Sequence, residues 1–217
     1  MAIDTRKGTG LLPVLVVVAL LLIFNGKLRD IGSDLLGGIT GHDTEIIGNG
    51  DGQVMVAGRA ASRVKQCTTQ ELLGQRKCDD LKIVIIDAAK IPFIARNIQL
   101  AWGEGKEFLL HKDAPYSDQP KRDAVCGPRV FKAHYENGSC DEYPMASTKE
   151  GGRPSKVRIE EVPLREQKCQ GGTLRQEYRR AQIGEGDSFI VVIRNPRDIA
   201  DVPYAGTDIG KDQSCLG

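Results

Sequence analysis

The stretch Cys140-Asp-Glu-Tyr-Pro-Met-Ala-Ser-Thr-Lys-Glu-Gly-Gly152 holds the densest cluster of reactive side chains in this chain. Asp141 and Glu142 are adjacent, so on a strand they would point to opposite faces, and only one of them can easily face a given site. Glu150 can return toward them through the turn at Gly151-Gly152. Carboxylates act as general bases and as ligands of hard cations such as magnesium or calcium. Spacing alone is more typical of a solvated acidic loop than of an active site.

Two strands and a helix are predicted upstream of this stretch. Residues 82–87 (KIVIID) form a β-branched run bounded by charges, which predicts a buried strand. Pro92 suits the first turn of a helix, and apolar residues recur at helical spacing as far as Gly103, so we expect a helix of about ten residues. Residues 107–111 (EFLLH) predict a second strand, followed by a polar loop that contains Pro115, Pro120 and Pro128.

The pattern changes again downstream. Residues 156–162 (KVRIEEV) alternate charged and apolar side chains, as a half-exposed strand requires. The sequence at 171–173 (GGT) predicts a turn and an N-cap before a short basic helix over 174–181. Residues 188–193 (SFIVVI) predict the last buried strand. The expected class is α+β, a small mixed sheet with flanking helices, in the order strand, helix, strand, loop, strand, helix, strand.

The overall composition is that of a globular protein, with 217 residues of which 40% are hydrophobic and 27% are charged. This length allows one domain with an extension, or two small domains. Thirty Lys plus Arg against twenty-nine Asp plus Glu leave a formal net charge of +1, which excludes histone-like binding by overall basicity. Contact with nucleic acid would have to come from a local patch.

The most apolar segment is 11–24 (LLPVLVVVALLLIF), within an uncharged stretch between Lys7 and Lys27. This stretch lies at the short end of the roughly 17–25 residues that span a bilayer. It favours an export segment over a buried core helix, which would keep a polar face. No good small-x-small cleavage site follows Phe24, which favours an uncleaved signal anchor. Both readings of residues 1–27, signal peptide and signal anchor, stay open.

Residues 28–63 separate this segment from the rest of the chain. Their Gly, Asp and Ser content predicts a linker, which ends in a hairpin around the sequence GNGDG at 48–52. We expect residues 64–217 to form the main domain.

Six cysteines are present, and no pair has the C-x-x-C spacing typical of structural zinc sites or of thioredoxin-like chemistry. Export would place an even set of cysteines in an oxidising compartment, so they predict disulfides. Short loops favour the pairs Cys67–Cys78 and Cys126–Cys140, and we expect Cys215 to pin back the C-terminal tail. Among six cysteines the sequence cannot choose one of the fifteen connectivities.

The order of residues in the central stretch is more specific than its spacing. CDEYPMASTKEGG at 140–152 closely resembles the signature of the NucA/NucB family of bacterial deoxyribonucleases, which reads approximately Asp-Glu-(Tyr or Trp)-Pro-x-Ala, followed by Glu-Gly-Gly. Residues 92–97 (PFIARN), 162–167 (VPLREQ) and 170–174 (QGGTL) also resemble this family, in its order. The resemblance is strongest over residues 80–195, and it implies that 64–217 is a nuclease domain.

The resemblance implies a ββα-metal (His-metal finger) core, in which a strand pair and a helix clamp one divalent cation, Mg²⁺ or Mn²⁺, over the scissile phosphate. Most such enzymes use a His at the end of the first strand to activate water. This family is similar but uses an Asp, and Asp141 matches that position. Burial should raise the pKa of Asp141, since a carboxylate is a weak base in bulk water. Glu142 and Glu150 would orient the site or help to hold the cation through water.

On the helix side, the family fold calls for an amide or carboxylate ligand. Gln170 is the first choice, and Glu166 or Gln167 is the next, because one inserted or deleted residue in the alignment would move the ligand. His134, seven residues before Asp141, is the alternative candidate for the base.

Residues 165–180 carry five cations and two carboxylates, a local charge of +3. A basic helix alone is typical of a solvated face, but beside the family motifs it indicates contacts with DNA phosphates. Such contacts hold a duplex without reading its sequence, so we expect little base specificity and a steep loss of binding with added salt. The candidate DNA-binding residues are Arg165, Lys168, Arg175, Arg179 and Arg180.

Two functions therefore compete. The first is a metal-dependent DNA endonuclease with little sequence specificity, either extracellular or anchored to the cell membrane and facing outside. The second is a catalytically silent, disulfide-braced module at the cell surface that binds DNA or a protein partner. Expected partners are DNA, the membrane through the N-terminal apolar segment if that segment stays uncleaved, and an inhibitor protein.

Overall fold

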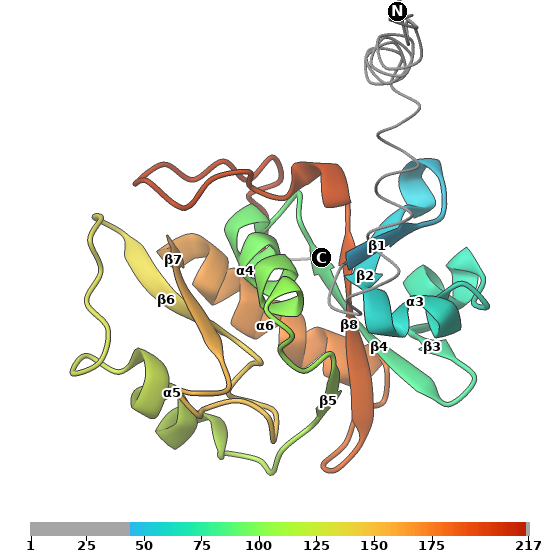
Figure 1. The fold of residues 1–217 in the computed structure, drawn as a ribbon, viewed down its shortest axis with the longest axis horizontal. Coiled ribbons are helices and arrows are strands. Elements are labelled where there is room, and N and C mark those ends of the chain that lie inside the picture. The colour runs from blue at the N-terminus through green and yellow to red at the C-terminus, as the bar shows by residue number, and fades with distance from the viewer. Residues whose placement is uncertain (1–43, 216–217) are drawn as a thin grey trace, which may run out of the picture. The chain divides into compact units, whose positions relative to one another are not determined.

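A computed structural model of the protein describes residues 44–215 (Figure 1). The predicted export segment over 1–27, and the predicted linker as far as residue 43, lie outside the described residues. Within residues 44–215, every helix is too short or too polar to cross a membrane.

The main sheet is built around two parallel strands, β4 (Leu81–Asp87) and β8 (Ser188–Arg194). Their alternate residues enter two separate apolar cores, with Val84 and Val191 on one face and Ile83 and Ile190 on the other. A strand that is buried on both faces carries a continuous apolar run, which is the pattern predicted at 82–87 and 188–193. The remaining strands of this sheet are β1 (Thr44–Ile47), β2 (Val54–Ala57), β3 (Lys77–Cys78) and β5 (Leu109–His111).

Helices cover both faces of this sheet. Helices α4 (Pro92–Gly103) and α6 (Leu164–Arg180) bury apolar side chains in one core, and α3 (Gly58–Val64) buries its own in the other. A π-helical turn at Gln70–Gln75 packs beside α3, with Leu72 in the same core. Pro92 begins α4, as predicted, because the first turn of a helix leaves its N–H groups without partners in any case.

A second sheet lies beside the first and consists of β6 (Gly138–Tyr143) and β7 (Arg158–Pro163). The two strands are antiparallel, with Asp141 opposite Glu160. Helix α5 (Asp118–Cys126) packs next to β6, and α4 and α6 lie between this hairpin and the main sheet (Figure 1). The molecule is an α+β protein with small sheets and flanking helices, as predicted.

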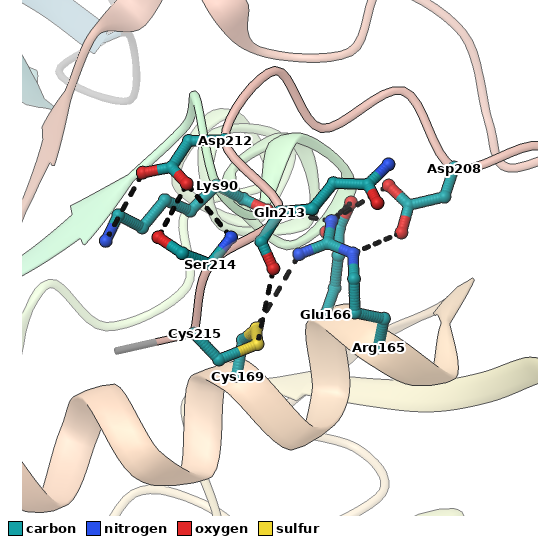
Figure 2. Close-up of a disulfide and its surroundings, with 9 residues drawn as sticks. All are labelled: Lys90, Arg165, Glu166, Cys169, Asp208, Asp212, Gln213, Ser214 and Cys215. Carbon is teal, nitrogen blue, oxygen red and sulfur yellow. Dashed lines mark hydrogen bonds and ion pairs between the residues drawn. A yellow bond between two sulfur atoms is a disulfide. The ribbon is translucent and has the colours of Figure 1, made fainter. Parts of the chain in front are cut away.

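Three disulfides brace the fold. Cys67–Cys78 and Cys126–Cys140 are the two pairs predicted from loop length. The third, Cys169–Cys215, joins α6 to the C-terminal tail, as Figure 2 shows. The same tail is held to α6 by Arg165, which donates to the carboxylate of Asp208.

Two predicted elements differ from the structure. The predicted polar loop after β5 contains α5, because Pro120 lies in the first turn of that helix, where its missing N–H is tolerated. The turn predicted at Gly171-Gly172 is absent, and α6 instead runs without a break from Leu164 to Arg180. Each glycine costs a helix about 1 kcal/mol relative to alanine, but burial of the α6 face that carries Leu174 and Tyr178 outweighs that cost.

The hairpin predicted near 48–52 is present as β1 and β2. It is more than the end of a linker, because β2 pairs with β8. Residues from Thr44 onward therefore extend the main sheet.

Candidate active site

Asp141 lies at the centre of the second sheet, on β6, with its side chain turned toward α4. Its side chain is nearly inaccessible, with 1% of the residue exposed. Nδ2 of Asn97 donates to Oδ2 of Asp141 over 2.8 Å, whereas Oδ1 has no hydrogen-bond partner. Burial raises the pKa of Asp141 to about 7, although the hydrogen bond from Asn97 opposes this shift. The group can therefore exchange a proton near neutral pH.

Asn97 is itself held in place from the far side of the hairpin. Arg158 on β7 donates to Oδ1 of Asn97 and forms an ion pair with Glu160. Glu160 also pairs with Arg96, the neighbour of Asn97 on α4. These contacts orient the Asn97 amide so that its NH₂ group points at Asp141.

Glu142 faces the opposite side of β6, as neighbours on a strand must. Its Oε2 atom lies 3.8 Å from a guanidinium nitrogen of Arg122 on α5 and 2.8 Å from Sγ of Cys126. Burial raises the pKa of Glu142, and the charge of Arg122 works against that shift.

A cleft of about 310 Å³ opens beside Glu142. Its walls come from α5, from β6 and the segment that follows it, and from α6. Carboxylate, amide and cationic side chains converge there on a partly apolar floor. The polar and charged residues that line it are Asp118, Arg122, Glu142, Ser147, Gln167, Lys168 and Gln170.

Gln170 lies between this cleft and Asp141. It lines the cleft, only 5% of the residue is exposed, and its Nε2 atom has no hydrogen-bond partner. The Gln170 amide also lowers the pKa of Asp141, though less than the amide of Asn97 does. Gln167 lies one turn earlier, where its amide can donate to the carbonyl oxygen of Cys140 over 3.0 Å and accept from Arg122 over 2.9 Å.

Glu166 has a different environment from these two glutamines. It is fully buried, and its Oε2 accepts the backbone N–H groups of Phe93 and Ile94, each over 3.0 Å. Backbone N–H groups in the first turn of a helix have no partner within the helix, and a carboxyl group is a suitable acceptor for them. Burial raises the pKa of Glu166 to about 8. Glu166 joins α6 to α4 and does not line the cleft.

Glu150 also lies outside the lining of the cleft. Its Oε2 accepts the backbone N–H of His111 over 2.9 Å, and its Oε1 lies 2.8 Å from Nδ1 of the same residue. These contacts hold the segment after β6 against β5. His134, the alternative base, is on the surface with 82% of its side chain exposed, and it pairs with Glu161.

Cys126, Cys140 and Glu142 bring three potential ligand atoms within 4.8 Å of one another. Metal ions bind the thiolate of cysteine. The two sulfur atoms here form a disulfide, so this group is not a metal site.

The basic residues of α6 divide into two sets. Arg165 donates to Asp208 and to the carbonyl oxygen of Lys90, and Arg180 lies 3.4 Å from Glu177. The other three are exposed, and none of them forms an ion pair with a carboxylate within residues 44–215. They are Lys168, Arg175 and Arg179.

Residues 99–192 match the family model described as deoxyribonuclease NucA/NucB. The chain carries a domain of the NucA/NucB family. The match includes β6, β7 and α6, and therefore Asp141 and the cleft. It begins after residues 92–97, which the sequence resemblance had included. No curated protein matches the chain at a significant level.

The NucA/NucB domain offers a donor set that suits a hard divalent cation. Glu142 supplies carboxylate oxygens, and Gln170 supplies an amide oxygen, from opposite walls of one cleft. Oxygen ligands of these kinds are those that Mg²⁺ prefers. Asp141 does not line this cleft itself, and its Oδ1 atom is buried without a hydrogen-bond partner.

Two residues of the candidate site have no role that the sequence predicts. Asn97 is only the last residue of a motif in the sequence resemblance, and Arg122 lies in a segment predicted as loop. A helix pattern for α5 was present, since Ser117 and Asp118 precede Pro120 in the order typical of a helix start.

Proposed function

We propose that this chain is a metal-dependent endonuclease that hydrolyses the phosphodiester bonds of DNA with little sequence specificity, outside the cytoplasm. One observation carries the proposal. In a domain of a deoxyribonuclease family, a buried carboxylate with a pKa near neutrality, Asp141, interacts with Gln170, and Gln170 lines a cleft together with Glu142 and cationic side chains.

Asp141 is the proposed general base. Oδ2 is occupied by Asn97, which leaves Oδ1 as the atom that takes the proton from the attacking water. The water oxygen forms the new bond to phosphorus, the bond from phosphorus to the 3′ oxygen breaks, and the leaving oxygen takes up a proton from solvent. A base works best when its pKa is near the working pH, which the burial of Asp141 provides.

Glu142 and Gln170 are the proposed ligands of the cation, Mg²⁺ or Mn²⁺, because both line the cleft. When bound, the cation polarises the phosphate and stabilises the charge on the leaving oxygen. Gln167 is the next candidate ligand from α6. Glu166 is a poor one, because its carboxylate already caps α4.

Phosphate contacts come from Arg122 and Lys168 inside the cleft and from Arg175 and Arg179 farther along α6. Lysine and arginine contacts to phosphates position DNA without reading bases. This supports the proposal of low sequence specificity.

The disulfides support a location outside the cytoplasm, since disulfides persist in oxidising compartments and are rare in the cytosol. The apolar run at 11–24 fits the same location, as a signal peptide or as an anchor. On this proposal the nuclease domain extends from Thr44, where the sheet begins, rather than from residue 64.

A plasmid-nicking assay on the oxidised full-length chain tests the function. We expect nicking with Mg²⁺ or Mn²⁺ and none in EDTA. Absence of cation-dependent nicking would leave the catalytically silent module as the better account.

The ligand assignment is tested by Gln170→Ala, which should raise the cation concentration needed for half-maximal nicking. Gln176→Ala is the matched control, since Gln176 lies on the same helix and does not line the cleft. An unchanged cation requirement in Gln170→Ala would reject Gln170 as a ligand.

A further inference from the structure

Gly171 lies in the middle of the α6 face that lines the cleft. Gln167 and Lys168 line the cleft from the turn before it, and Leu174 lines it from the turn after it. Glycine in a helix interior is unfavourable relative to alanine, because it loses more backbone freedom on folding. The chain therefore carries a destabilising residue at a point where it faces the cleft.

The protein's own packing does not require glycine at this position. A Cβ atom added to Gly171 would meet no heavy atom within 4 Å outside the local backbone of the helix. Gly151 is a contrasting case, because a Cβ atom there would clash with the carbonyl oxygen of Met145. The space at Gly171 is open, and it belongs to the cleft.

The neighbouring residues make this part of the cleft polar and cationic. The Gln170 amide lines the same cleft and acts on the buried carboxylate of Asp141, whose pKa it lowers. The ammonium group of Lys168 lines the cleft one turn before Gly171. A cation in this position suits an anionic phosphate oxygen of a DNA strand.

We propose that Gly171 is the point at which the sugar-phosphate backbone of the substrate packs directly against the main chain of α6, within reach of Gln170 and Lys168. The inference rests on the proposed nuclease function and adds a positioning residue to it. A side chain at 171 would hold the strand away from the cleft. Misplacement of a substrate by about 1 Å can cost about 100-fold in rate.

Gly172 supplies the matched control. It follows Gly171 on the same helix, is rotated by about 100° around the axis, and does not line the cleft. A Cβ atom there would also meet nothing within 4 Å. Gly171→Ala and Gly172→Ala should therefore each raise Tm by about 2–4 °C, the gain expected for replacing a helical glycine.

The two variants should differ in function. For Gly171→Ala we expect kcat/KM for nicking to fall by about 10- to 100-fold while Tm rises, and for Gly172→Ala we expect nicking within about twofold of the unaltered chain. A rise in stability together with a loss of activity is not what a structural role for Gly171 would give. Unchanged nicking by Gly171→Ala, equal losses in both variants, or a lower Tm in Gly171→Ala would overturn the inference.

A binding measurement separates this inference from the proposed function. Fluorescence anisotropy with a labelled DNA duplex in EDTA should show weaker binding by Gly171→Ala than by Gly172→Ala, whether or not the chain cleaves DNA. Equal affinities would overturn the role of Gly171. Failure of the unaltered chain to nick plasmid DNA would instead reject the nuclease proposal.

Discussion

The amide of Asn97 donates a hydrogen bond of 2.8 Å to Oδ2 of Asp141, and this contact ties α4 to the centre of β6. Both side chains are almost completely buried. The hydrogen bond favours the ionised carboxylate and so limits the rise in pKa that burial imposes on Asp141.

Replacing Asn97 by Ala should therefore shift the pH dependence of nicking. The base acts when deprotonated, so the rate rises with pH through the pKa of Asp141. Loss of the hydrogen bond moves this rise to higher pH and lowers the rate at pH 7 by about 10-fold or more. Initial nicking rates measured from pH 5 to pH 9 check this.

The control is Arg158→Gln, which removes a donor to Asn97 but leaves the amide next to Asp141. We expect a smaller shift in the same direction. A pH profile that keeps its midpoint in Asn97→Ala would mean that another group is titrating.

Glu166 predicts how stability depends on pH. Its pKa is about 8 in the folded protein and 4.5 is its ordinary value, so between these values the folded protein keeps a proton that the unfolded chain has released. The contribution of Glu166 to stability is therefore present below pH 4.5 and is lost as the pH rises toward 8. Between pH 4.5 and pH 8, the free energy of unfolding should fall less steeply with pH in Glu166→Gln than in the unaltered chain. The difference between the two slopes should be up to about 1.4 kcal/mol per pH unit.

Urea unfolding of the unaltered chain and of Glu166→Gln from pH 4 to pH 9 measures this difference. Parallel stability curves would show that Glu166 ionises normally in the fold. Glu166→Gln should also keep the cation requirement of the unaltered chain, whereas a raised requirement would make Glu166 a ligand after all.

Cys126–Cys140 joins α5 to β6 at the residue next to Asp141. Replacing both cysteines by Ala should lower stability by about 2–5 kcal/mol. It should also lower nicking at temperatures well below Tm, because Arg122 on α5 would no longer be held beside Glu142. Thermal unfolding and nicking of the same preparation check both effects.

The matched control is the double variant at Cys67–Cys78, which closes a loop of similar size on the opposite side of the main sheet. It should lose comparable stability and keep its activity. Equal loss of activity in the two double variants would mean that the Cys126–Cys140 bridge has no special effect on the site.

Lys168, Arg175 and Arg179 predict the salt dependence of DNA binding. Each contact with a phosphate contributes about 0.9 to the slope of log K against log salt. Replacing any one of the three by Gln should reduce that slope by about 1. Lys77→Gln, an exposed change on β3, should leave it unchanged. Anisotropy titrations at several salt concentrations measure these slopes, and a flat response in the unaltered chain would contradict phosphate binding by α6.

Much of the fold is predictable from the sequence, because its central elements have local patterns. The runs at 82–87 and 188–193 are apolar throughout since both faces of β4 and β8 are buried. Two disulfides are predictable because each closes a short loop. The presence of α5 and the continuity of α6 are not predictable in this way. Pro120 is typical of a loop but is tolerated in the first turn of α5, and the helix-breaking tendency of the two glycines in α6 is outweighed by packing of that helix.

The site is only partly predictable for a related reason. Asp141 is found through its family motif, whereas its partner Asn97 is forty-four residues away along the chain and meets it only in the folded protein. Glu166 and Gln170 lie one turn apart on α6, so the sequence offers both as ligands. Their surroundings separate them, since one caps α4 and the other lines the cleft.

The central claim is that Asp141 is the general base, and Asp141→Asn tests it most directly, since the change keeps the shape of the side chain and removes the base. Nicking of plasmid DNA at saturating Mg²⁺ should fall by about 100-fold or more, while DNA affinity in EDTA and Tm stay close to those of the unaltered chain. Near-normal nicking by Asp141→Asn would contradict the claim and move the search for the base to other residues, His134 first.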